Sequence, residues 1–220
     1  MPVTNYYHIA SVTIPSTWIA LIVACVAAYI GIRMKFGKSH AERFGDAVFY
    51  VIIIWKLSVI ITQFDTVIHA PISIVYFNGG FVGFCLGLAF VAFRTVMDVR
   101  KEKLDGKGLV VLFTGAVVAL ALFQVMMAVL NNGGSFVKII TIVVFLAVAI
   151  VVWISAMKDG EQFVQLSWLV MAAHTFVAAV QPKGVFQPAH IVTLAIGLFF
   201  IVLFTRKSKF VLEKRGNYSE

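Results

Sequence analysis

The sequence predicts an all-α, multi-pass membrane protein with seven helices. Hydrophobic residues make up 61% of the 220 residues and charged residues only 13%, which is about half the charged fraction of a typical soluble domain. The apolar residues fall into seven runs, and a helix needs about 20 residues to cross a hydrocarbon core of about 30 Å. This composition excludes a disordered chain, a disulfide-stapled secreted domain and an ordinary soluble enzyme.

We expect a single transmembrane domain over residues 1–220, because every connection between the apolar runs is short. Strands of a membrane barrel would be about ten residues long with alternating polarity, and the runs lack that pattern. The predicted spans are 16–33, 47–64, 79–97, 108–130, 137–156, 163–180 and 188–205.

Basic residues predict the orientation of these spans. Summed over alternate connections, 15 of the 18 Lys and Arg residues lie on one side of the membrane and only Lys138 and Lys183 lie on the other. The positive-inside rule makes the basic side cytoplasmic, with the N-terminus outside and the C-terminus inside. Most of the net charge of +8 therefore reflects topology. We expect contact with anionic phospholipid and no nucleic-acid partner.

The remaining basic residue, Lys56, lies near the middle of span 47–64. An ionisable side chain at that depth is costly and marks a candidate functional site. Its ammonium could bind a lipid phosphate or a carboxylate from an internal cavity, with Gln63 on the same helix face. The alternative is a structural ion pair, or hydrogen bonds to carbonyls of a broken helix. Asp46 and Asp65 lie about two helical turns or more away.

Two further polar residues lie inside predicted spans. His174, in span 163–180, could be a general base, or could be hydrogen-bonded to a neighbouring helix. Gln124, in span 108–130, is expected to make an interhelical hydrogen bond. Cys25 and Cys85 are expected to behave as small apolar residues. A redox pair would require their Cα atoms to lie within about 7 Å of each other. Whether these cysteines are neighbours stays open.

The polar exceptions gather on one side of the predicted topology, which favours a polar cavity open to the extracytoplasmic leaflet. They are Lys56, Gln63, Asp65, His69, Asn78, Gln124, Asn131, Asn132, His174, Gln181 and His190. No metal-spaced Cys cluster, Walker motif or dinucleotide glycine fingerprint is present, so we expect no cofactor or metal.

Gly79, Gly83 and Gly87 recur every four residues in span 79–97. This small-residue stripe predicts close approach to another helix. Alternatively, the Asn78-Gly79-Gly80 entry could bring backbone N–H groups near a ligand.

The stretch from about Pro15 to Phe93 resembles the N-terminal half of the prolipoprotein diacylglyceryl transferase family. STWIALIVACVAAYIGIR and ERFGDAVFYVIIIWKLSVI are similar to the first two spans, with Lys56 where the family usually has Arg. Pro71 matches a loop proline, and YFNGGFVGFCLGL resembles the aromatic-x-Gly-Gly turn and third span. The family's His-Gly-Gly motif is absent, and its Arg-containing signature has no counterpart in span four.

This resemblance implies seven spans in a bacterial plasma membrane and a phosphatidylglycerol site in an outward-facing cavity. A lipid-derived group would be transferred to a lipoprotein or another secreted protein. Lys56 would stabilise developing negative charge and His174 would act as base. Substrate would be bound by Lys56, Gln63, Asn78, Gly79, Gly80 and Gln124.

Two other functions stay open. The first is a non-catalytic lipid- or partner-binding module of the same fold, which the missing family residues favour. The second is a small-solute transporter, against which the lack of internal repeats and of a mid-span acid argues.

Overall fold

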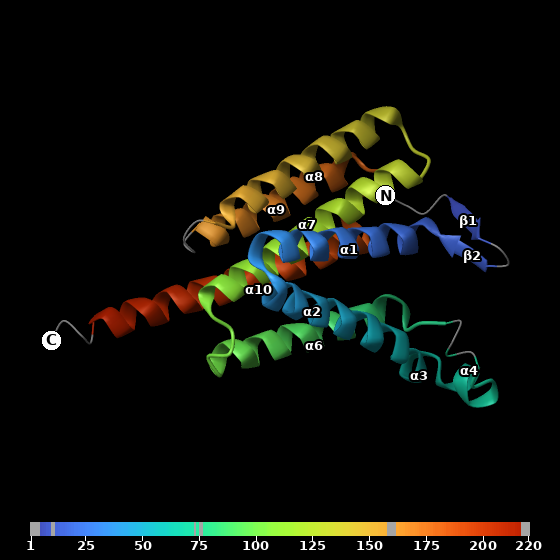
Figure 1. The fold of residues 1–220 in the computed structure, drawn as a ribbon. Coiled ribbons are helices and arrows are strands. Elements are labelled where there is room, and N and C mark those ends of the chain that lie inside the picture. The colour runs from blue at the N-terminus through green and yellow to red at the C-terminus, as the bar shows by residue number, and fades with distance from the viewer. Residues whose placement is uncertain (1–4, 10–11, 73, 75–76, 158–161, 217–220) are drawn as a thin grey trace.

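The structure, a computed structural model, describes residues 5–9, 12–72, 74, 77–157 and 162–216. These residues are mostly helical, and seven helices are long and apolar enough to cross a membrane (Figure 1). The seven are Ser16–Phe36, Lys38–Thr62, Gly80–Arg100, Gly106–Leu130, Ser135–Ser155, Gln162–Val180 and Pro188–Arg206. The predicted all-α, seven-span fold class is therefore confirmed. Lys158, counted above for the orientation, lies outside the described residues.

Helices α1 (Ser16–Phe36) and α2 (Lys38–Leu57) are separated by Gly37 alone. Hydropathy located the second span at residue 47, but the helix begins at Lys38, because helices continue through polar residues beyond the hydrocarbon core. Gly37 has φ 88° and ψ 175°, a backbone region open essentially only to glycine. One residue can therefore reverse the chain here.

The second predicted connection is partly helical. After α2, the short helix α3 (Val59–Thr62) is followed by α4 (Phe64–His69). Gln63 separates them with φ −137° and ψ 47°, which is not helical geometry. Helix α6 (Gly80–Arg100) then returns along α2 (Figure 1).

Helix α7 (Gly106–Leu130) is the most buried of the seven and lies between α1 and α8 (Ser135–Ser155). The Asp105 side chain caps it by accepting a hydrogen bond from the Gly108 amide at 2.7 Å. Helices α9 (Gln162–Val180) and α10 (Pro188–Gly216), joined through the short 3-10 helix η1 (Gly184–Phe186), pack against each other. An aromatic cluster joins α7, α9 and α10. It contains Phe113, Phe163, Phe200 and Phe204.

An antiparallel hairpin that the sequence analysis did not predict precedes α1. It consists of β1 (Tyr6–Ile9) and β2 (Val12–Pro15). The side-chain amide of Asn5 and the hydroxyl of Tyr7 both donate to the Leu130 carbonyl, over 2.8 and 3.1 Å. Ser16 donates to the Asn131 side-chain oxygen over 2.8 Å. The start of the chain is thus tied to the end of α7.

The glycine stripe of α6 lies against α2, as predicted. A Cβ added at Gly83 would overlap the Ser58 hydroxyl, and one at Gly87 would lie 2.8 Å from the Val51 carbonyl oxygen. Side chains at these positions would force the two helices apart, so the glycines permit a close backbone approach.

The two ends of the bundle differ. The hairpin, α3 and α4 lie at one end, on the right of Figure 1. The α1–α2 and α6–α7 connections lie at the other end, which we call the basic end because it holds Lys38, Arg43, Arg100 and Lys103.

Candidate functional site

Buried polar side chains from α7, α9 and α10 form a hydrogen-bonded cluster around His174. His174 is 0% exposed, and its Nδ1 lies 2.6 Å from the Thr193 hydroxyl of α10. Thr193 donates its own proton to the Ala189 carbonyl over 3.0 Å, so His174 Nδ1–H donates to Thr193. The Nε2 of this neutral ring is left as an acceptor for the Gln124 amide nitrogen at 3.4 Å. The structure thus brings together two predicted site residues, His174 and Gln124.

A second histidine, His190 at the start of α10, packs against the first, with ring centroids 5.3 Å apart. Its Nδ1 donates to the Val185 carbonyl over 2.7 Å, because a carbonyl oxygen can only accept. Its Nε2 lies 2.9 Å from the Thr175 hydroxyl of α9. Both ring nitrogens therefore have partners, and His190 ties the start of α10 to α9.

The surroundings of His174 are closed. The Phe145 ring of α8 packs edge-on against the imidazole, with centroids 5.0 Å apart. The Gln124 Oε1 atom is buried and has no hydrogen-bond partner among the described residues. This setting fits the alternative in which His174 is bonded to a neighbouring helix. A role as general base would need access for a substrate and stays a prediction.

Two other residues of the predicted outward group, Gln181 and Asn131, also join helices. Gln187 donates to the Gln181 side-chain oxygen over 2.8 Å, and Gln181 donates to the Thr141 hydroxyl over 3.3 Å. Asn131 accepts from Ser16, as described above. The predicted outward-facing cavity stays a prediction, since these side chains bond helix to helix.

Lys56 lies half-buried in the last turn of α2, beside the junction with α6. The carbonyl of its neighbour Trp55 accepts from the Gly79 amide over 3.0 Å. The Trp55 indole N–H donates to the Gly80 carbonyl over 2.8 Å. The structure therefore places Gly79 and Gly80 at the helix end that carries Lys56.

The other predicted residues at this end make local bonds or face outward. The Asn78 side-chain oxygen accepts from the Gly80 amide over 2.9 Å. Gln63 is exposed at the break between α3 and α4. His69 Nδ1 donates to the Asp65 carbonyl over 2.7 Å within α4.

The two residues assigned to catalysis lie on different helix pairs. Helix α2 packs mainly against α6 and α1, whereas α9 packs mainly against α10 and α8. Lys56 is not a hydrogen-bond partner of His174, whose two ring nitrogens face Thr193 and Gln124. The structure does not join the two predicted catalytic groups.

Cys25 of α1, half-buried, and Cys85 of α6, exposed, are free thiols. Within the described ranges, no group of three or more His, Cys, Asp and Glu side chains is placed to hold a metal ion.

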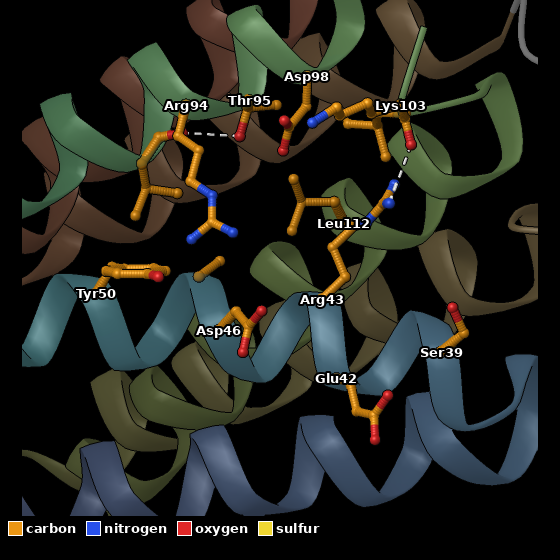
Figure 2. Close-up of a pocket in the computed structure, with 13 residues that line it drawn as sticks. Ser39, Glu42, Arg43, Asp46, Tyr50, Arg94, Thr95, Asp98, Lys103 and Leu112 are labelled. Atoms are coloured by element: carbon orange, nitrogen blue, oxygen red, sulfur yellow. Dashed lines mark hydrogen bonds between the residues drawn. The ribbon is translucent and has the colours of Figure 1, made fainter. Parts of the chain in front are cut away.

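A charged cavity of about 330 Å³ opens among α2, α6 and the start of α7, at the basic end (Figure 2). Its wall combines charged, aromatic and aliphatic side chains. The lining residues are Ser39, Glu42, Arg43, Asp46, Ala47, Tyr50, Val91, Arg94, Thr95, Asp98, Lys103, Leu104 and Leu112. We call this space the basic-end cavity.

Two arginines in this cavity are held in place. The Arg94 guanidinium lies over the Tyr50 ring, 4.4 Å from its centre, in a cation–π contact. Arg43 donates to the Lys103 carbonyl over 3.0 Å. Figure 2 shows Arg94 and Arg43 reaching into the space from α6 and α2. A guanidinium has five N–H donors, so each arginine keeps donors for a ligand.

Three carboxylates line the same space. Glu42 lies 3.5 Å from Lys38, one turn earlier on α2. In the part of the chain that the structure describes, the carboxylates of Asp46 and Asp98 have no ion pair and no hydrogen bond. The cavity therefore presents both signs of charge to an occupant.

This cavity was not predicted from the sequence, because Arg43 and Arg94 were interpreted only as markers of orientation. The spacing of oppositely charged residues on two helices could have indicated it. Arg43 and Asp46 are three residues apart and Arg94 and Asp98 are four apart, and these spacings place each pair on one helix face.

Comparison with known proteins leaves the family open: no family model, no curated protein and no solved structure matches this chain.

Proposed function

We propose that this α-helical, multi-pass membrane protein binds the phosphate of a phospholipid head group in the basic-end cavity. The observation that carries the proposal is the Arg94 guanidinium, fixed over Tyr50 in a cavity of about 330 Å³. Guanidinium groups bind phosphate oxygens through paired, charge-assisted hydrogen bonds. This proposal shares lipid binding with the non-catalytic module considered above, but that module was expected to bind its lipid at Lys56, at the other end of the bundle.

The cavity lies at the depth of a head group. Arg94 lies six residues before the end of α6 at Arg100, which is about 9 Å along the helix. Asp46 lies eight residues after the start of α2 at Lys38, which is about 12 Å. These charges therefore sit within the last turns of their spans, where lipid phosphates meet the hydrocarbon.

Apolar surface next to the cavity suits acyl chains. Phe90 and Phe93, just before Arg94 on α6, are 42% and 64% exposed. Val91 and Leu112 lie in the cavity wall. An amphiphile could place its phosphate on Arg94 and its chains along the exposed face of α6.

Lipid binding to the purified full chain tests the proposal. Phosphatidylglycerol and phosphatidylethanolamine are titrated separately in a neutral detergent and followed by native mass spectrometry. Arg94→Gln should weaken binding of both lipids by about ten- to hundredfold, since a hydrogen bond to a charged group contributes about 1.5–3 kcal/mol.

Arg100→Gln is the matched control, because it removes the same charge from the same helix at an exposed position outside the cavity wall. It should leave both affinities within about twofold. Equal losses in the two variants would indicate general charge attraction and would refute the site.

A second candidate, transfer of a lipid-derived group, is favoured by one observation at the opposite end. Half-buried Lys56 adjoins the Gly79–Gly80 turn, through the two bonds that Trp55 makes. The resemblance to diacylglyceryl transferases implies a phosphatidylglycerol site around these residues. The acceptor would be the cysteine of a lipoprotein precursor.

Labelled phosphatidylglycerol and a lipobox peptide test this activity in the reconstituted full chain. Label should appear on the peptide, and Lys56→Met should abolish the transfer. Lys183→Met, at an exposed lysine between α9 and α10, should not. Absence of label on the peptide, beside an active control enzyme, removes this candidate.

A further inference from the structure

We infer that the head group bound in the basic-end cavity carries a primary amine as well as a phosphate. The inference rests on the proposed function and specifies its ligand class. The ligand is a zwitterionic amphiphile of the phosphatidylethanolamine type, with the phosphate on Arg94 and the amine between the carboxylates of Asp46 and Asp98.

The charge balance of the wall supports a ligand with both signs. Arginines and a lysine contribute three cations and the acidic residues three carboxylates. Glu42 is already paired with Lys38. Asp46, which is exposed, and Asp98, which is half-buried, would repel a purely anionic head group and attract an ammonium.

The positions of the charges along the helices support the order phosphate, then amine. Arg94 contacts the Tyr50 ring across the space between α6 and α2. Asp98 follows Arg94 by four residues toward the basic end, and Asp46 precedes Tyr50 by four residues toward the same end. On each helix, the aspartate therefore lies one turn, about 6 Å, nearer the basic end than the residue of the Arg94–Tyr50 contact.

A bound phospholipid has the same order. Its phosphate lies next to the glycerol and the apolar chains, and its amine lies farther out toward water. The two-carbon spacer of ethanolamine can span about one helical turn. Figure 2 shows Asp46 on α2 and Asp98 on α6, on opposite walls of the space.

A primary amine fits better than a quaternary one. An ammonium has three N–H donors for the two carboxylates, whereas choline has none. Choline binds best over an aromatic face, and the Arg94 guanidinium already covers the face of Tyr50 in this wall.

The test compares head groups on the purified full chain in a neutral detergent, by native mass spectrometry. Wild type should bind phosphatidylethanolamine at least tenfold more tightly than phosphatidylglycerol or phosphatidylcholine of the same chain length. This affinity ratio is measured on the wild-type chain, so it does not depend on the folding of any variant. The double variant Asp46→Asn/Asp98→Asn should lose the preference, and Asp65→Asn on α4 is the matched control that should keep it.

The outcomes separate this inference from the proposed function. Equal or tighter binding of phosphatidylglycerol, still dependent on Arg94, overturns the amine and leaves the head-group site standing. Binding of both lipids that is unaffected by Arg94→Gln overturns the site itself. Soluble glycerophosphoethanolamine should bind at least a hundredfold more weakly than the lipid, and equal binding would overturn the membrane lipid as the source.

Discussion

Substitution of Gly87 by alanine should separate α2 from α6. The new Cβ would lie 2.8 Å from the Val51 carbonyl oxygen and 3.1 Å from the Val51 Cα. Both are backbone atoms of α2 and cannot rotate away. The two helices must therefore move apart over the part of their interface that the glycine stripe forms.

The change in the free energy of unfolding of Gly87→Ala is the sum of two opposing effects. Overpacking a close interface costs about 1–3 kcal/mol. Replacing a helical glycine by alanine gains about 1 kcal/mol from helix propensity. Gly45→Ala on α2 has the same propensity gain, but its Cβ meets only the edge of the Tyr29 ring, at 3.2 Å, and a ring can shift. The difference between the variants isolates the backbone clash at about 1–3 kcal/mol.

The assay is reversible unfolding of the full chain from mixed micelles by increasing sodium dodecyl sulfate, followed by far-ultraviolet circular dichroism. Gly87→Ala should unfold at a lower detergent fraction than Gly45→Ala. The free energy of unfolding should be lower by about 1–3 kcal/mol. Free energies of unfolding within about 0.5 kcal/mol of each other would refute the close α2–α6 contact.

Three other substitutions test separate parts of the structure by the same unfolding assay. Asn131→Ala should cost about 1–3 kcal/mol, because it leaves the buried Ser16 hydroxyl without its acceptor, and an unchanged midpoint would contradict that bond. Gln124→Leu should be nearly neutral or stabilising, because it removes a buried oxygen that has no partner and only one long bond to His174, and a loss above about 1 kcal/mol would contradict this. Gly37→Ala should cost about 1–3 kcal/mol through backbone strain alone, since nothing lies within 4 Å of its added Cβ, and wild-type stability would show that the turn can rearrange.

The spans could be predicted from the sequence because lipid imposes a length and a polarity on each helix. The ends of the helices were not predicted correctly. Helix α2 begins at Lys38 and not at residue 47, since hydropathy registers only the part of a helix that contacts hydrocarbon. The β1–β2 hairpin was missed because its stability comes from bonds to Leu130 and Asn131, far away in the chain.

The candidate sites depended on helix rotation and on pairing, which hydropathy does not contain. The sequence singled out Gln124 and His174 separately, and only the packing of α7 against α9 and α10 shows that they bond. The glycine stripe was predictable because its spacing alone defines a helix face. The basic-end cavity was not, because its charges come from α2, α6 and the α6–α7 connection, whose mutual positions only the structure gives.

The packing of α1 against α7 has a consequence for synthesis of the chain. At about 5–20 residues per second, α7 is complete roughly 5–20 s after α1. During that delay the face that α1 will bury must contact lipid. It consists of Ala20, Ala24, Ala28 and Ile32, and of one polar residue, Ser16, at the first position of the helix. The apolar part of this face allows the first helix to remain stable in the bilayer on its own. The bonds of Ser16 and of the hairpin to the end of α7 can form only after α7, the fourth of the seven spans, has been made.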